Sequence, residues 1–288
     1  MSVDVIGILP NAMDASDVFE KFLSSEDQEK QLILQTCADI LMNICLFFMI
    51  SIIIFLINEL LKPDSQLRSS YFALITFGMI LYSTFIIGKD IGYIFSDIDI
   101  KSFINNLIQW YMSLDLACWN TFLALNRATA LSFPVGHDRF WTKNLTIFYC
   151  LFVFGFPFIV DFKTFFYPCF WKGFTTNCTT FQLEDQVYAS AWTMAHALFA
   201  LLITIVSLTY SKSKGFDAAR KVECRLMFQT VFGSTMITLF AISQWLSVHF
   251  FSKKDRVLFI QFLGISQFLS AFYFYPIIFV LFFARFVF

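Results

Sequence analysis

Charged residues are scarce in this chain. Only 14% of its 288 residues are Asp, Glu, Lys or Arg, whereas about 25% is usual for a soluble domain. Hydrophobic residues reach 58%, and 41 of them are phenylalanine. This composition excludes an ordinary water-soluble globular protein and indicates a chain that faces lipid.

Histidine is also rare, with three in the whole chain. His137, His196 and His249 are far apart and lack the spacing of a zinc or di-iron site. No glycine-rich phosphate loop or nucleophile elbow is present. We therefore expect neither an enzyme nor a bound metal or cofactor.

Long apolar runs dominate what remains. A bilayer core about 30 Å thick needs roughly 20 apolar residues per helix, and the chain has seven such runs. They are continuous rather than alternating, which excludes a β-barrel and leaves helices. The sequence predicts an all-α membrane protein with an acidic tail over residues 1–37 and a seven-helix domain over 38–288. The expected helices cover residues 40–61, 71–88, 107–133, 145–166, 187–210, 226–251 and 257–283.

The charge distribution and one sequon favour an N-terminus outside and a C-terminus inside. This orientation puts 11 of the 20 basic residues on the inner side, a weak bias of the usual sign. It also places Asn177-Cys178-Thr179, an acceptor for N-glycosylation, outside. We expect Asn177 to carry a glycan.

Two cysteines share the expected outer loop between the fourth and fifth helices. Cys169 and Cys178 would lie in an oxidising compartment, where disulfides form and persist. A bridge between them and a pair of free thiols both remain possible from the sequence.

Polar residues inside the apolar runs are candidates for a ligand site, because they are costly in lipid and usually face the bundle. Asp115 lies about 18 Å from Arg127 along one helix. It is either a ligand counter-ion or a protonated carboxyl bonded to another helix, and the structural reading is favoured. Asn120 is expected to join helices. Lys89 and Asp90 are expected to neutralise each other at the interface.

Several side chains in the outer halves of the helices are predicted to line a pocket with aromatic walls and few polar anchors, as small-molecule sites usually have. Gln109 and Trp110 belong to this region. The candidate ligand residues are Tyr111, Asp115, His196, Gln244, Trp245 and Tyr273.

One stretch is more specific than the rest. Residues 125–134 read LNRATALSFP, and Trp141 follows seven positions later. This LNR-x-[ST]-x-x-x-x-P pattern with a following tryptophan resembles the Srg superfamily of nematode serpentine chemoreceptors. The resemblance extends over the whole chain in length and layout.

The resemblance implies a seven-helix receptor in the plasma membrane of sensory neurons, in their cilia. Such a receptor binds a small external chemical or pheromone and activates a heterotrimeric G protein. No nucleic-acid partner is expected. Arg127 matches the arginine that follows an acid in rhodopsin-like receptors, but Asn126 replaces that acid here. The arginine therefore lacks its usual intrahelical ion pair, and another group must hold it at rest.

Basic residues also gather in the third inner loop, about residues 211–225. They suit anionic lipid, at about 1 kcal/mol per charge near the surface, and they equally suit a cytoplasmic partner. We predict that Asn126, Arg127, Arg220 and Lys221 form the G-protein coupling site.

A multi-pass transporter or ligand-gated channel is the alternative. Transporters tend to show repeated halves, with paired breaks in their helices and charges at the midplane. Seven segments do not divide into equal repeats, the six prolines form no matching pair, and Asp115 stands alone within its helix. These features favour the receptor.

Overall fold

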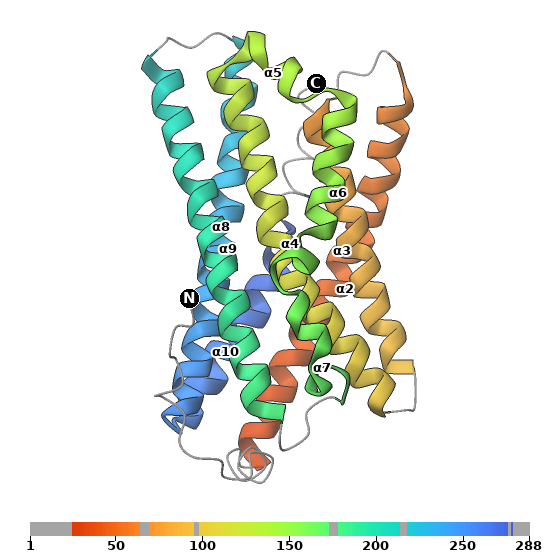
Figure 1. Ribbon diagram of the computed structural model, residues 1–288, viewed down its shortest axis with the longest axis vertical. Helices are drawn as coiled ribbons and strands as arrows, with labels where there is room; N and C mark the ends of the chain where they lie inside the picture. Colours follow the sequence, from red (N-terminus) through yellow and green to blue (C-terminus); the bar gives the residue numbers. More distant parts are fainter. Residues whose placement is uncertain are drawn as a thin grey trace.

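The computed structural model describes residues 25–63, 69–94, 98–172, 178–213, 218–275 and 278. In Figure 1 the long helices run side by side along the long axis of the molecule. They are α2 (Ser25–Leu61), α3 (Ser70–Ile94), α4 (Ile98–Ser132), α6 (Lys143–Val160), α8 (Thr179–Ser213), α9 (Ala218–Ser252) and α10 (Arg256–Phe272). Shorter pieces are α5 (Pro134–Phe140), the 3-10 helix η2 (Phe162–Phe166) and α7 (Pro168–Lys172).

Successive long helices alternate in direction, so the bundle has two distinct ends (Figure 1). We call one the α5 end; there α2, α4 and α8 finish and α3, α6 and α9 begin. We call the other the α7 end; there α2, α4, α8 and α10 begin and α3, α6 and α9 finish.

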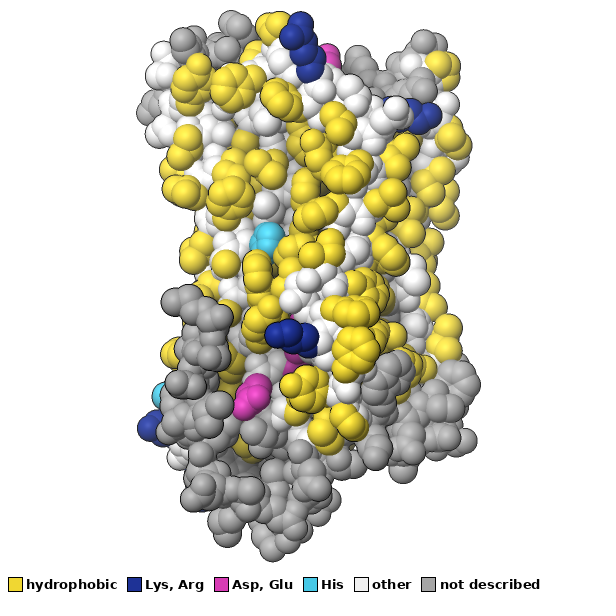
Figure 2. All heavy atoms as spheres, in the orientation of Figure 1, with side chains coloured by type: hydrophobic (Ala, Val, Ile, Leu, Met, Phe, Trp, Pro, Cys, Tyr) yellow, Lys and Arg dark blue, Asp and Glu magenta, His cyan; other side chains and the backbone are white. Residues whose placement is uncertain are grey.

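Within the described residues, five helices are long and apolar enough to cross a membrane: α2, α3, α6, α8 and α9. α10 is apolar but shorter. Large hydrophobic side chains such as Phe47 and Phe228 are 70% exposed on the outside of the bundle, where lipid would cover them. Figure 2 shows hydrophobic side chains across the middle of one face, with basic and acidic ones nearer its top and in its lower part.

α4 is less hydrophobic than these helices because of where it lies. It packs against α3, α6, α8 and α9, so neighbouring helices screen most of its surface from lipid. Its buried polar residues include Asp115, Asn120, Asn126 and Arg127. A helix enclosed by protein can carry such groups, since they need not enter hydrocarbon.

Several helix boundaries differ from the sequence prediction; α4, α8 and α9, for example, begin eight or nine residues earlier than predicted. α2 begins at Ser25, so residues 25–37, expected in the acidic tail, are helical. The fourth predicted helix ends at Val160 rather than near residue 166, and a 3-10 helix follows. Pro157 lies in its last turn, and Asp161 stops the helix by accepting hydrogen bonds from Trp110 Nε1 at 2.7 Å and Thr164 Oγ1 at 2.6 Å.

The contact between α3 and α4 is the tightest that we find around a glycine. Trp119 is 1% exposed and donates its indole N–H to the Leu74 carbonyl at 2.8 Å. Its ring lies where a side chain of residue 78 would stand, because a Cβ on Gly78 would be 2.2 Å from Trp119 Cε2. Glycine at 78 therefore makes room for the tryptophan that joins the two helices.

We predict that Gly78→Ala destabilises the bundle by about 1–3 kcal/mol, as inserted methyl groups do in packed cores. The matched control is Gly155→Ala in α6, where a new Cβ meets nothing within 4 Å; alanine there should be neutral or slightly stabilising. Thermal unfolding of the protein in lipid nanodiscs, followed by tryptophan fluorescence, compares the two variants. Equal Tm values for both would contradict this account of the α3–α4 contact.

Candidate functional site

Arg127 lies near the α5 end of α4 and is 4% exposed. Its guanidinium carbon is 3.5 Å from the centroid of the Tyr71 ring, at the start of α3. A cation over an aromatic face is attracted by the ring quadrupole, by about 2 kcal/mol when the pair is desolvated. An aromatic ring on α3 is thus one partner of Arg127, while the preceding position on its own helix carries an asparagine and no acid.

Further polar contacts tie this region to α3 and α9. The Tyr71 hydroxyl donates to Gln229 Oε1 on α9 at 3.4 Å, and both side chains are buried. Asn126 donates through Nδ2 to Ser70 Oγ at 2.8 Å. Asn126 Oδ1 is buried without a hydrogen-bond partner in the described part of the chain. We call Ser70, Tyr71, Asn126, Arg127 and Gln229 the arginine cluster; it joins α3, α4 and α9.

The rest of the LNR stretch shapes the turn that follows α4. Trp141 donates its indole N–H to Thr129 Oγ1 at 2.8 Å and packs against Tyr149 at 4.9 Å. Pro134 begins α5, where its missing N–H costs nothing. The threonine, proline and tryptophan of the pattern therefore fold α5 back against the end of α4.

The other predicted coupling residues cannot be placed in the same way. Arg220 and Lys221 belong to the first turn of α9, which begins at the α5 end. Their side chains lie outside the described residues. The structure therefore places two predicted coupling residues, Asn126 and Arg127, in one cluster.

Two adjoining cavities occupy the half of the bundle toward the α7 end. The inner cavity, about 360 Å³, reaches Met42, Leu116 and Phe240. The mouth cavity, about 320 Å³, reaches Cys169 and Phe170 of α7. These volumes suit small organic molecules.

Carboxamide side chains dominate the polar lining shared by the two cavities. They come from five helices, so their amides converge from different sides. The shared lining includes Gln35, Asn106, Gln109, Gln186, Gln244, Gln267 and Ser113. The site is richer in neutral hydrogen-bonding groups than the aromatic pocket that the sequence predicted.

Of the six predicted ligand residues, all of them described, Gln244 lines the cavities. Tyr111 faces α6 instead, since its hydroxyl donates to the Phe154 carbonyl at 2.6 Å. Asp115 is 8% exposed and absent from the lining, and its Oδ1 has no hydrogen-bond partner among the described residues. The cavity face of α4 carries Gln109, Met112 and Leu116, so helical periodicity turns positions 111 and 115 away.

The other three predicted residues also lie elsewhere. His196 Nδ1 is 3.2 Å from Thr121 Oγ1, and its ring packs edge-on against Phe156. Trp245 is 51% exposed on the outer surface and stacks on His249. His196 and Trp245 do not line the cavities, because their side chains lie on other faces of α8 and α9.

Tyr273 is buried in a polar network at mid-bundle. Its hydroxyl donates to Asn120 Oδ1 at 3.2 Å, and Asn120 Nδ2 donates to Ser234 Oγ at 2.7 Å. A Cβ on Gly233 would stand 3.3 Å from both Asn120 and Tyr273, so glycine there leaves room for the network. This set, the mid-bundle network, connects α4, α9 and α10, as expected of Asn120.

Sequence reasoning missed most of the carboxamides. Gln35, Asn106 and Gln186 lie in the helix halves nearest the α7 end, whereas Gln267 lies in the second half of α10. The available signal was the presence of glutamines and asparagines just before the outer ends of several predicted helices, and one within the seventh. Lys89 also lines the inner cavity, and its Nζ binds Asp39 Oδ1 on α2 at 2.8 Å rather than its neighbour in sequence. The expected pairing with Asp90 is corrected accordingly, because helical geometry points adjacent residues in different directions.

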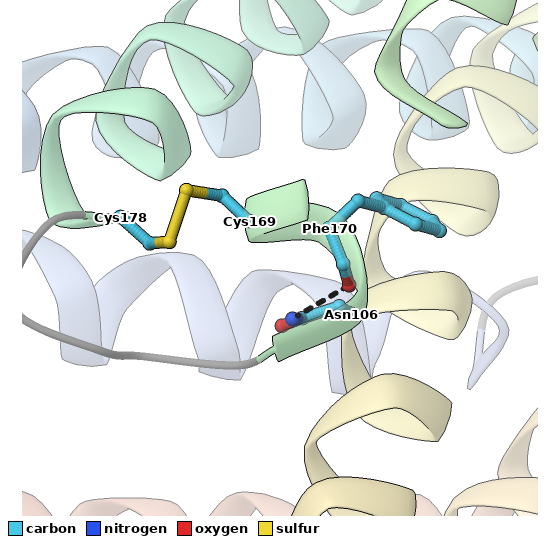
Figure 3. The surroundings of a disulfide bond; sticks show 4 residues. All are labelled: Asn106, Cys169, Phe170 and Cys178. Carbon is cyan, nitrogen blue, oxygen red and sulfur yellow. Dashed lines mark hydrogen bonds between the residues drawn. A yellow bond between two sulfur atoms is a disulfide. The ribbon is translucent and has the colours of Figure 1, made fainter. Parts of the chain in front are cut away.

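A disulfide joins Cys169 to Cys178 at the mouth, with an S–S distance of 2.11 Å (Figure 3). It links α7 to the start of α8. Beside it, Asn106 Nδ2 on α4 donates to the Phe170 carbonyl at 3.4 Å (Figure 3). The loop therefore contacts α4 through a hydrogen bond, whereas its disulfide lies within the loop itself. The sequon residue Asn177 lies outside the described residues.

Comparison with known proteins gives one match. The family model described as Srg family chemoreceptor matches residues 91–286, more than half of the chain. No curated protein and no solved structure matches this chain.

We predict that replacing both loop cysteines, Cys169→Ser with Cys178→Ser, lowers stability by about 2–4 kcal/mol, the usual value for a lost disulfide. The matched control is Cys37→Ser, which alters an exposed free cysteine of α2. Thermal unfolding in nanodiscs measures both, and digestion by trypsin at Lys172 reports local opening of the mouth. Unchanged unfolding and digestion in the double variant would show that the bridge does not hold α7 in place.

Proposed function

We propose that this chain, which belongs to the Srg family of chemoreceptors, binds a small external chemical in the cavities at the α7 end and activates a heterotrimeric G protein at the α5 end. Members of this family are multi-pass receptors with seven membrane helices, and they are not enzymes. The family match carries the proposal. It favours a receptor over the transporter or channel considered from the sequence.

The positions of the two sites support this division of roles. The cavities open beside α7, whereas the arginine cluster lies toward the opposite end of the bundle. α4 takes part in both, since Leu116 lines the inner cavity and Arg127 lies about 17 Å further along the same helix. A ligand that shifts α4 would therefore also shift the arginine cluster.

The mid-bundle network supplies a route between the two sites. Asn120 lies between Leu116 and Arg127 on α4 and is bonded to α9 and α10. α9 also carries Gln244 at the cavity and Gln229 in the arginine cluster. Relative movement of α4 and α9 would change the cavity, the network and the Tyr71–Gln229 contact together.

We propose further that the N-terminus and the α7 end face outward, in the plasma membrane of a sensory cell and in its cilia. The disulfide at the mouth supports this topology, because such bonds persist in an oxidising compartment. The α5 end would then face the cytoplasm, where Arg220 and Lys221 begin α9.

For coupling, we predict that Arg127→Ala reaches the cell surface but lowers G-protein activation about tenfold or more, as the loss of a charged contact of about 1.5–3 kcal/mol would do. Arg139→Ala is the control, because it removes an exposed basic residue of α5 at the same end. Basal signalling through a promiscuous G protein, divided by surface expression, measures both. Normal signalling by surface-expressed Arg127→Ala would remove the assigned role.

Tyr71→Phe serves as a second variant in this assay, in case Arg127→Ala does not reach the surface. It keeps the ring beneath Arg127 and removes only the hydroxyl that contacts Gln229. Basal signalling should rise, since α3 and α9 are then less firmly joined in the resting state. An unchanged basal level would mean that this contact does not restrain the receptor.

For topology, we predict that Asn177→Gln increases the gel mobility of the expressed protein by removing one glycan. Asn144→Gln is the control, because the proposed orientation puts a second sequon, Asn144-Leu145-Thr146, in the cytoplasm, where it is not modified. Treatment with a glycosidase should shift the unaltered chain to the position of Asn177→Gln. A mobility change confined to Asn144→Gln would reverse the proposed orientation.

A further inference from the structure

The chemistry of the cavity lining restricts the ligand. Its polar groups are mostly carboxamides and hydroxyls, each carboxamide offering both N–H donors and a carbonyl acceptor. Such groups bind hydrogen-bonding molecules of either donor or acceptor type without supplying a net charge. A wall of this kind suits an uncharged ligand with several hydrogen-bonding atoms.

Lys89, the basic residue of the lining, already has an acidic partner on the protein, since its Nζ binds Asp39 Oδ1 at 2.8 Å. Asp185 lines only the mouth cavity, with its Oδ1 3.4 Å from the Thr164 hydroxyl, whose shorter hydrogen bond, 2.6 Å, goes to Asp161. An anionic ligand would have to compete with Asp39 for the lysine. A charge moved from water into a cavity without a free counter-charge is strongly disfavoured.

On three of the lining helices the side chains change from polar to apolar with depth, whereas on α10 Leu263 lies nearer the α7 end than Gln267 and Ser270. On α2, α4 and α9, moving inward from the α7 end, carboxamides come first and apolar side chains follow. Gln35 precedes Met42, Gln109 precedes Met112, and Gln244 stands one turn nearer the end than Phe240. A ligand that matches this order is amphiphilic, with its apolar part innermost.

Gln267 supplies the strongest unmet hydrogen-bonding capacity in this lining. It lines both cavities, and its Oε1 is buried without a hydrogen-bond partner among the described residues. A buried carbonyl oxygen left unpaired is unfavourable, so a hydrogen-bond donor on a ligand would stabilise the complex by binding there. No other carboxamide of the shared lining has a buried oxygen or nitrogen in this condition within the described residues.

From these observations we propose that the cavities bind an uncharged amphiphile, with its hydrogen-bonding head among the carboxamides, donating to Gln267 Oε1, and a short hydrocarbon part against Met112, Leu116 and Phe240. The inference rests on the proposed receptor function and names the chemical class of its ligand. The polarity of the lining disfavours purely hydrocarbon odorants, which would leave Gln267 Oε1 unpaired.

The test uses three probes that share a hexyl chain and differ in the head: N-hexylurea, heptanoate and hexylammonium. The full-length receptor in nanodiscs is titrated with each, and the rise in Tm is followed by tryptophan fluorescence. N-hexylurea should raise Tm in a saturable manner, because its three N–H groups and carbonyl match the lining, while the two ions should not. A larger shift with heptanoate would assign the site to anions, and one with hexylammonium would assign it to cations; either overturns the proposal, as does the absence of a shift with N-hexylurea.

Two leucine substitutions on α10 locate the binding. Gln267→Leu should raise the half-saturating concentration of N-hexylurea about tenfold, the effect of losing one hydrogen bond to a buried acceptor. Gln261→Leu is the matched control, since Gln261 is exposed on the same helix and lies outside the described lining. Equal half-saturation in the two variants would overturn the assignment of Gln267.

A second urea tests whether the apolar part of the lining contributes to binding. N-methylurea carries the same head without the long chain, so it should stabilise the receptor much less than N-hexylurea. Equal shifts would show that the apolar floor takes no part. Because this assay needs no G protein, its outcome is independent of the Arg127→Ala test, and either proposal can fail while the other stands.

Discussion

The structure depends on one constraint: a helix rich in polar side chains must cross the bilayer without exposing them to lipid. α4 meets it by packing against α3, α6, α8 and α9. The surrounding helices bear the large exposed hydrophobic side chains, and α4 bears Asn120, Asn126 and Arg127. Because leaving such groups in hydrocarbon is costly, their burial determines which helices lie at the centre.

The same enclosure gives α4 its functional place. It contributes Gln109 and Leu116 to the cavities and Arg127 to the arginine cluster. Buried hydrogen bonds from Asn120 connect it to α9 and α10 between those sites. In a closely packed interior these contacts have few alternative arrangements, and the route proposed between the two sites rests on this.

Arg127 illustrates how a missing neighbour can be replaced from another helix. Without an acid at position 126, the guanidinium lies over the Tyr71 ring, while Asn126 bonds Ser70. Both contacts reach α3, so the resting position of the arginine depends on helix packing and not on its own helix. The sequence left the partner of Arg127 open, and the structure shows the Tyr71 ring as one partner of its guanidinium.

The family and the helical membrane fold followed from the sequence, because they depend on composition, on the length of apolar runs and on the local pattern from Leu125 to Trp141. Most of the residues that line the cavities could not be predicted from the sequence. Gln109 and Gln244 were predicted, whereas Gln35, Asn106 and Gln267 were found only once the helices were packed. Hydropathy reports the depth of a residue in the membrane, but not the rotation of its helix. That rotation is set by contacts between helices distant in sequence, such as Trp119 against Gly78, and it alone decides which polar side chains face a common cavity.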